Sequence, residues 1–194
     1  MNLERAIQKG KQLRVLGIDD APFDKEAGSV VNLVGIICSQ TRFEGMLWTD
    51  TLKDGTAATE AIIKMVSQSK FYQQLHFIMI DGIAVGGFNV IDLPQLSQQL
   101  NLPCIAVMRH YPNLSAIDAA LHYFDDYSRR SEIIKKAGAI YQQNGFVYQA
   151  SGCSADIAAI ALQQVTDTGH VPEALRLAHF IGAAVKTGES SQRA

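Results

Sequence analysis

The feature that most constrains this chain is an apolar run that ends in one carboxylate and turns at glycine, Leu75-His-Phe-Ile-Met-Ile-Asp81-Gly82. A short apolar run with a turn signal behind it predicts a buried β-strand. A second stretch, Arg14-Val-Leu-Gly-Ile-Asp19-Asp20-Ala-Pro22, has the same pattern. Because open α/β sheets bind ligands beyond the carboxyl ends of their strands, Asp19 and Asp81 could hold a hard cation between them. Asp before Gly or Pro is also ordinary turn chemistry, and that alternative stays open.

Length and composition limit the class of protein. The chain has 194 residues, of which 47% are hydrophobic and 19% charged, so we expect one globular domain over residues 1–194, with loose ends at 1–12 and 187–194. No apolar run approaches the roughly 20 residues that span a membrane. The amino terminus carries both charge signs and no apolar signal core, which predicts a cytoplasmic protein with no membrane partner.

The cysteines and the net charge further limit which kinds of site the chain could carry. Cys38, Cys104 and Cys153 are odd in number and widely spaced among apolar or small residues, which favours reduced structural thiols. The formal net charge is −2, so nothing global attracts nucleic acid. Any phosphate binding would have to be local, at a metal ion or a small basic patch.

The order of elements predicts a mixed α/β sheet flanked by helices. Three strands with short connections, ending at Asp19 and covering 29–39 and 43–52, predict an antiparallel meander. A helix at 57–69, the strand ending at Asp81, a helix at 94–100 and a strand at 102–108 then form a parallel βαβ unit. We expect the remaining elements to be helices at 115–124, 127–137, 154–165 and 173–185, with a strand at 145–151.

Polar and glycine-rich positions near the strand ends are candidates for substrate binding. The turn after Asp81 lacks the spacing of a P-loop or a dinucleotide fingerprint, but glycine lets a backbone approach a ligand closely. Arg109 follows the 102–108 strand and could neutralise a phosphate oxygen or pair with one of the acids. Arg129, Arg130, Lys135 and Lys136 share the polar side of one helix, as a solvated face or a backbone-contacting patch. The predicted substrate-binding residues are Gly86, Gly87, Phe88, Asn89 and Arg109.

Several motifs resemble a family of endonuclease V-like proteins known as domain of unknown function ninety-nine. They occur in order over nearly the whole chain: Leu16-Gly-Ile-Asp-Asp20, Asp81-Gly82 with Gly87-Phe-Asn-Val90, Pro172-Glu-Ala-Leu-Arg-Leu-Ala-His179, and Gly188-Glu-Ser190. More distantly, the chain resembles endonuclease V itself. That resemblance implies a ribonuclease H-like fold that cleaves nucleic acid near a deaminated base with carboxylate-held magnesium.

The resemblance to endonuclease V assigns roles to individual residues. It matches the metal-binding carboxylates to Asp19, Glu60 and Asp81, and the lysine that follows a later strand to Arg109. Asp156, at the start of a later helix, is a possible fourth metal ligand. Glu60 and Asp156 also have a structural alternative, since carboxylates at helix amino termini are favoured by the helix dipole alone. We therefore predict Mg²⁺ or Mn²⁺ as the cofactor, with Asp19, Glu60, Asp81 and Arg109 as the catalytic set.

Two departures from endonuclease V bear on the substrate. Gly87-Phe88-Asn89 stands where that family has His-Pro-Arg, and Thr51-Leu52-Lys53-Asp54 replaces its aromatic base-sensing wedge. These differences count against recognition of a deaminated base.

Three functional hypotheses follow. The first is a magnesium-dependent, nuclease-like protein that acts on DNA or RNA. The second is a non-catalytic nucleic-acid-binding or scaffold protein that retains the fold, and the third is a metal-dependent phosphohydrolase of a small nucleotide. The sequence leaves the oligomeric state open, a homodimer included.

Overall fold

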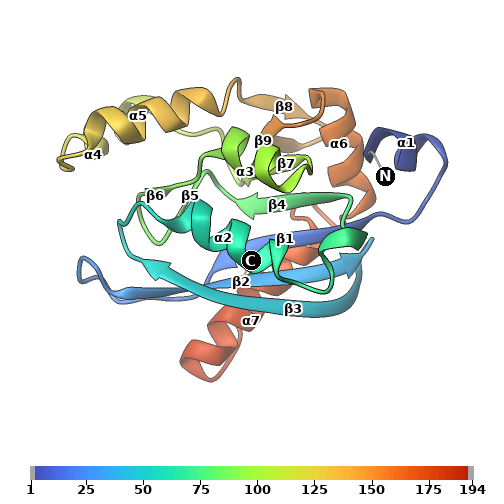
Figure 1. The fold of residues 1–194 in the computed structure, drawn as a ribbon, viewed down its shortest axis with the longest axis horizontal. Coiled ribbons are helices and arrows are strands. Elements are labelled where there is room, and N and C mark those ends of the chain that lie inside the picture. The colour runs from blue at the N-terminus through green and yellow to red at the C-terminus, as the bar shows by residue number, and fades with distance from the viewer. Residues whose placement is uncertain (1–2, 192–194) are drawn as a thin grey trace.

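The computed structural model describes residues 3–191, which form one seven-stranded mixed sheet with helices on both faces (Figure 1). The order across the sheet is β3-β2-β1-β4-β7-β9-β8. β1, β2 and β3 pair antiparallel, whereas β4 pairs parallel with β1 and β7 pairs parallel with β4. The strands are β1 (Arg14–Asp20), β2 (Val30–Ser39), β3 (Arg42–Leu52), β4 (Phe77–Asp81), β7 (Cys104–Met108), β8 (Tyr141–Gln143) and β9 (Phe146–Ser151). The predicted mixed sheet, a meander followed by parallel strands, is confirmed.

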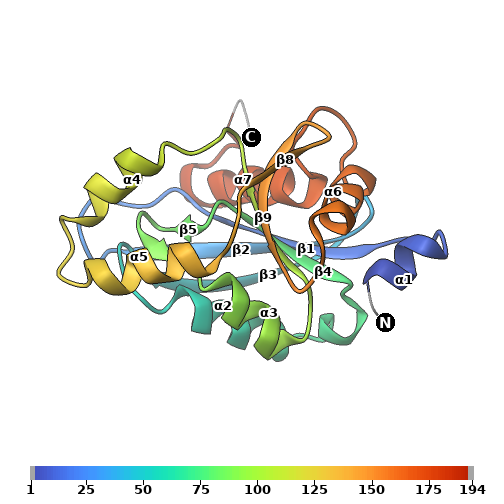
Figure 2. The ribbon, with the colours of Figure 1, turned by 90° about the horizontal axis from the view of Figure 1, so that it is seen from above.

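Helices cover both faces of the sheet. Seen from above, α6 and α7 lie on one side of the sheet and α2 and α3 on the other, while α4 and α5 extend beyond the strands (Figure 2). Asp92 and Ser154 cap α3 and α6 by accepting backbone N–H groups with their side chains. The helices are α1 (Leu3–Gln8), α2 (Ala58–Ser67), α3 (Leu93–Leu100), α4 (Leu114–Leu121), α5 (Tyr127–Lys136), α6 (Ala155–Gln164) and α7 (Glu173–Thr187).

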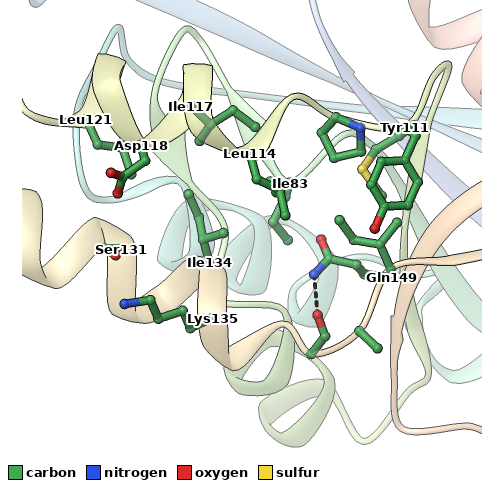
Figure 3. A pocket seen from close by; sticks show the side chains of 15 residues that line it. Ile83, Tyr111, Leu114, Ile117, Asp118, Leu121, Ser131, Ile134, Lys135 and Gln149 are labelled. Carbon is green, nitrogen blue, oxygen red and sulfur yellow. Dashed lines mark hydrogen bonds between the residues drawn. The ribbon is translucent and has the colours of Figure 1, made fainter.

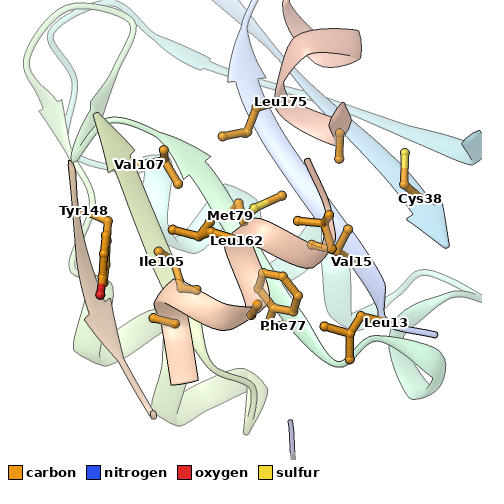
Figure 4. Close-up of a cluster of buried hydrophobic side chains, with 14 of the residues drawn as sticks. Leu13, Val15, Cys38, Phe77, Met79, Ile105, Val107, Tyr148, Leu162 and Leu175 are labelled. Carbon is orange, nitrogen blue, oxygen red and sulfur yellow. The ribbon is translucent and has the colours of Figure 1, made fainter. Parts of the chain in front are cut away.

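Alternation along the central strands builds two hydrophobic cores. Val15 and Phe77 face the core beneath α1, α6 and α7, and their neighbours Leu16 and Ile78 face the core beneath α2 and α3. Successive strand side chains point to opposite faces, so strands apolar at every position are covered on both sides. Figure 4 shows the first core, in which Phe77 and Met79 pack towards Leu162. The uninterrupted apolar runs of the sequence therefore reflect burial on both faces.

A glycine in β1 sets how closely α7 approaches the sheet. A Cβ placed on Gly17 would lie 2.7 Å from the backbone carbon of Ala174 in the first turn of α7. Real Cβ atoms do not approach backbone that closely, so α7 can pack here only because residue 17 has no side chain. This contact sets the distance between the first turn of α7 and the middle of β1.

Several elements differ from the expectations. The amino-terminal segment was expected to be loose, but residues 3–8 form α1, with Leu3 and Ala6 buried in the core. β9 runs antiparallel to β7 and is joined by the short strand β8, which the sequence did not predict. The glycine-rich turn contains a small hairpin of β5 (Ala84–Val85) and β6 (Asn89–Val90), and a 3₁₀ turn covers Tyr72–Gln74.

The termini and cysteines complete the description. α7 extends to Thr187, and residues 192–194 of the expected carboxyl-terminal loose end lie outside the described residues. The three cysteines are free thiols, as expected, and burial raises the pKa of Cys38 to about 12 and of Cys153 to about 11. None of the helices formed by residues 3–191 has the length and apolar character needed to cross a membrane.

Candidate active site at the carboxyl ends of the central strands

Three neighbouring strands bring two of the predicted acids, Asp19 and Asp81, and the predicted arginine to one edge of the sheet. β1 and β4 are in parallel register, with Ile18 opposite Ile80, so Asp19 and Asp81 follow at adjacent positions. β7 lies on the other side of β4 and delivers Arg109 directly after Met108. The convergence expected from two strands that both end in acid is present for Asp19 and Asp81.

The environment of Asp19 is unfavourable for a negative charge. Its residue surface is only 5% exposed. Burial, and then the charges of Asp81 and Asp20, raise the pKa of Asp19 from 3.8 to about 8, although the Asp20 N–H and Arg109 act in the opposite direction. Like charges close together in a desolvated site raise each other's cost of ionisation. A carboxyl group perturbed in this way at a strand end is characteristic of a functional site.

Asp20 ties β1 to the glycine-rich turn. The Gly86 N–H donates to Asp20 Oδ2 at 2.5 Å. Burial raises the pKa of Asp20 and the Gly86 hydrogen bond opposes that effect, while the charge of Asp81 adds to the rise. Gly86, predicted to bind substrate, is thus positioned beside the acids by its backbone.

His179 contacts Asp19 from the face of the sheet that α7 covers. Its Nδ1 lies 3.0 Å from Asp19 Oδ2, a distance at which one shared proton joins the two groups. The second oxygen, Oδ1, accepts the N–H of Asp20 at 2.8 Å. Both oxygens of Asp19 are therefore oriented, and the carboxylate cannot rotate freely.

Arg109 pairs with the second acid. Its Nη2 lies 3.5 Å from Asp81 Oδ2, and about half of its side chain remains exposed. Both alternatives for this arginine are compatible with that position, because an exposed guanidinium next to Asp81 can also reach a phosphate oxygen.

The rest of the glycine-rich turn is held by an internal network. Asn89 is fully buried, accepts the N–H of Ala58 at the start of α2 and donates to Thr51 and Leu52. The Phe88 ring packs on Phe124, with ring centroids 5.6 Å apart. In the free protein these two side chains support the turn, and their predicted contact with substrate stays a prediction.

Arg130 is the group that holds this turn against α5. Although expected on a polar helix face, it is only 5% exposed and donates to the carbonyls of Asp54, Gly55 and Phe88 while pairing with Asp126. The expectation was wrong for this residue because its guanidinium donates to three backbone carbonyls and to the Asp126 carboxylate rather than to water.

Glu60 and Asp156, the other predicted ligands, lie in different surroundings. Glu60 is exposed on α2 and accepts a 3.4 Å hydrogen bond from Gln95 of α3. Asp156 is exposed at the start of α6 and accepts from Gln143 of β8 at 3.3 Å. Neither acid is among the charges that shift the pKa of Asp19 or Asp20. Within residues 3–191, no three His, Cys, Asp or Glu side chains are grouped closely enough to hold a metal ion by themselves.

Sequence reasoning gave His179 too little weight. His179 lies among Leu177, Ala178 and Phe180 and was not among the predicted site residues, yet it contacts Asp19 from 160 positions away in the chain. The signal that could have identified it was present, since His179 closes the longest family-like motif, Pro172 to His179.

Comparison with known proteins places this architecture in a class: a ribonuclease H-like fold of the endonuclease V type. Endonuclease V from Bacillus subtilis superimposes with a TM-score of 0.61 at 9% identity, covering 97% of this chain and 84% of that one. Ciona intestinalis endonuclease V, in complex with a 24mer DNA containing an inosine followed by a ribo-adenosine, gives a TM-score of 0.54 at 13% identity, covering 87% and 84%. At these identities the likeness establishes the fold.

The chain belongs to the family described as Endonuclease dU, whose model matches residues 11–186. A "UPF0215 protein" of Methanothermobacter thermautotrophicus is 40% identical, covering 92% of this chain and 90% of the relative. A protein of unknown function from Archaeoglobus fulgidus, known from its crystal structure, is 32% identical with a TM-score of 0.85, covering 90% and 98%. The resemblance inferred from the motifs is thereby confirmed.

Proposed function

We propose that this protein is a divalent-metal-dependent nuclease that hydrolyses a nucleic-acid phosphodiester at the carboxyl ends of β1, β4 and β7. The observation that carries the proposal is the placement of Asp19 and Asp81 on adjacent parallel strands, with Arg109 against Asp81. The endonuclease V-like fold and the Endonuclease dU family support it.

The two acids fit a divalent cation of the magnesium type. Mg²⁺ prefers oxygen ligands, and nucleotide-processing sites often hold it by only one or two carboxylates, with water and substrate phosphate completing the shell. Asp19 and Asp81 supply two such groups, and their mutual repulsion is what a cation between them would relieve. Glu60 and Asp156 remain predicted ligands, and each would have to leave its glutamine partner to join.

The chain's own residues have separable roles in this proposal. A bound divalent cation supplies charge stabilisation for the phosphodiester and lowers the pKa of a water nucleophile. His179 and the Asp20 N–H hold the carboxylate of Asp19 in place. Arg109, half exposed beside Asp81, binds a non-bridging phosphate oxygen.

The observations that bear on the identity of the substrate point in two directions. The replacement of the endonuclease V wedge by Thr51-Leu52-Lys53-Asp54 counts against recognition of a deaminated base. The family description, Endonuclease dU, counts for deoxyuridine in DNA, and a fold relative is known bound to inosine-containing DNA. Deoxyuridine-containing DNA is therefore the first substrate to test, beside inosine-containing and undamaged DNA and RNA.

The deciding experiment has a binding half and a cleavage half. Mn²⁺ binding is measured by calorimetry on the wild type, D19N and D81N, with D50N on the exposed face of β3 as a matched Asp-to-Asn control. We expect binding by the wild type and D50N, and its loss in D19N and D81N. Cleavage of end-labelled oligonucleotides should fall by more than about a hundredfold in the same two variants.

Other results separate the rival hypotheses. Salt-dependent DNA binding without cleavage in Mg²⁺ or Mn²⁺ would indicate a binding protein that retains the fold. Release of phosphate from mononucleotides but no cleavage of polymers would indicate a small-nucleotide phosphohydrolase. Equal metal binding by the wild type and D81N would refute the proposed site.

A further inference from the structure

Two surfaces of the molecule expose groups of apolar side chains. The first is a pocket of about 460 Å³ between α4, α5 and β9, with Gln149 and aliphatic side chains such as Ile117 and Ile134 in its walls (Figure 3). The second is β3, the outermost strand of the sheet. The pocket is a hollow enclosed by elements of this chain, whereas β3 presents an open edge. An open edge is a surface that the strand of another chain can extend.

β3 is the longest strand of the sheet, and within residues 3–191 it pairs only with β2. Unpaired N–H and C=O groups on an edge strand are a template for another strand, and proteins usually protect such edges with lysine, proline or a short strand. β3 contains neither lysine nor proline, and residues 45–49 carry no charge. Its one irregularity, opposite Ile37 and Cys38, lies near its amino end. Residues 45–52 therefore form a regular, unprotected edge.

One face of β3 carries an apolar row of Phe43, Met46 and Trp48. These side chains lie opposite β2 residues that belong to the core beneath α7, so they share the face on which α7 packs. They are between 38% and 49% exposed, since α7 packs mainly on β1 and β2. The other face is covered by α2, and the ring of Phe71 lies against Gly45. The open face of an antiparallel sheet is normally polar, so this row indicates a surface that another molecule covers.

The last helix supplies a second apolar element at this edge. α7 crosses the sheet obliquely, and its carboxyl end projects beyond β3 (Figure 1). Val185, in the last turn of α7, is 60% exposed. A strand added to β3 would continue the sheet at a spacing of about 4.8 Å and would lie beneath this projecting end. The edge of β3 and the end of α7 therefore offer two adjacent contacts to the same partner.

We infer that this protein forms a homodimer in which β3 pairs antiparallel with β3 of a second copy. A twofold axis normal to the sheet joins the two edges, and the projecting end of α7 from each copy lies on the apolar row of the other. A strand of 11 residues is about 37 Å long, and a sheet with one layer of helix is about 20 Å deep. The contact is then roughly 700 Å² on each copy, close to the about 800 Å² that a standard interface takes from each partner.

The dimer has a consequence for the two candidate active sites. The twofold axis reverses the direction of the strands, so the carboxyl ends of β1 and β4 in one copy open away from those in the other. Each copy would then act on a separate substrate. The inference is independent of the proposed reaction, because the apolar row of β3 and Val185 are not among the groups that surround Asp19 and Asp81.

The test measures the oligomeric state and the environment of Trp48 together. Sedimentation equilibrium over a series of protein concentrations compares the mass in solution with the 21.2 kDa of one chain. Trp48 is the only tryptophan, so its emission reports on the same surface. M46K places a charge in the apolar row and V185K places one on α7, while I160K, at a 39% exposed position of α6, is the matched control. Circular dichroism checks folding, and F43K repeats the test on the same row if M46K does not fold.

We expect the wild type and I160K to be dimers, M46K to raise the Kd of the dimer by at least about a hundredfold, and V185K to raise it by about tenfold. On dilution of the wild type, the emission of Trp48 should shift to longer wavelength as the mass falls. A wild type that is monomeric at every concentration would overturn the inference. A dimer that M46K and F43K leave intact would refute β3 as the interface. A dimer that M46K disrupts and V185K leaves unchanged would refute the contact between α7 and the second copy.

Discussion

The imidazole Nδ1 of His179 lies 3.0 Å from Oδ2 of Asp19, joining the last helix to the first strand. The contact is possible because Gly17, two residues before Asp19, lets α7 pack against the β1 backbone. His179 is thereby a positioning residue for Asp19, and it ties the geometry of the candidate site to the packing of α7.

Removing this imidazole should have a larger effect on metal affinity than on folding stability. Partners that orient a metal ligand typically contribute about 10–100-fold to metal affinity, so H179A should raise the Kd for Mn²⁺ by that factor. H179N, whose amide nitrogen can occupy the place of Nδ1, should recover most of the loss. Calorimetry on the three proteins measures the effect. Equal metal affinity in H179A and the wild type would show that Asp19 needs no support from α7.

Stability without metal should fall as the pH rises. The pKa of Asp19 is about 8 in the folded protein and 3.8 as an ordinary value, so the folded state binds the extra proton between these limits. The free energy of unfolding then decreases from about pH 4 to pH 8, by at most about 6 kcal/mol. D19N should remove the larger part of this slope, since Asp20 keeps its raised pKa, and the variant should be more stable than the wild type at pH 8. Urea denaturation in EDTA at pH 5 and pH 8 measures it, with D50N expected to behave like the wild type.

Arg130 should be essential for the position of the glycine-rich turn. R130M would leave the carbonyls of Asp54 and Phe88 without their donor and Asp126 without its partner, so we expect a loss of about 3 kcal/mol of stability. The neighbouring R129M, at an exposed position of α5, should change stability by less than about 0.5 kcal/mol. Chemical denaturation of both variants is the measurement. A similar small effect in both would mean that the buried network contributes little.

Gly87 should tolerate no side chain, because a Cβ there would meet a neighbouring carboxylate in addition to straining the backbone. Its φ is +85°, and an added Cβ would clash with the Asp54 carboxylate that accepts the N–H of Phe88. Gly28 has a similar φ of +76° and open space around it. G28A should therefore lose about 1 kcal/mol from backbone strain, and G87A at least about 1 kcal/mol more. Thermal unfolding of the two variants compares them, and equal losses would contradict a steric role for Asp54.

The sequence by itself determined the central strands and the two principal acids. Short apolar runs that end in turn signals indicate strands covered on both faces. Each run placed a carboxylate where its strand ends, so Asp19 and Asp81 were predicted from local pattern alone. The family could also be recognised from the sequence, because its motifs are contiguous stretches such as Pro172 to His179.

Only the tertiary structure decided which distant groups meet. β9 was predicted as a strand, but its antiparallel direction depends on the path of the α4–α5 excursion, which periodicity does not encode. Arg130 lies on a helix whose charged residues are typical of a solvated face. It is buried because backbone carbonyls from two loops accept its N–H groups. His179 reached Asp19, and Gln149 faced a pocket, through packing between segments far apart in the chain. Local propensity is set by neighbours in sequence, whereas the partners of a polar group are set by neighbours in space.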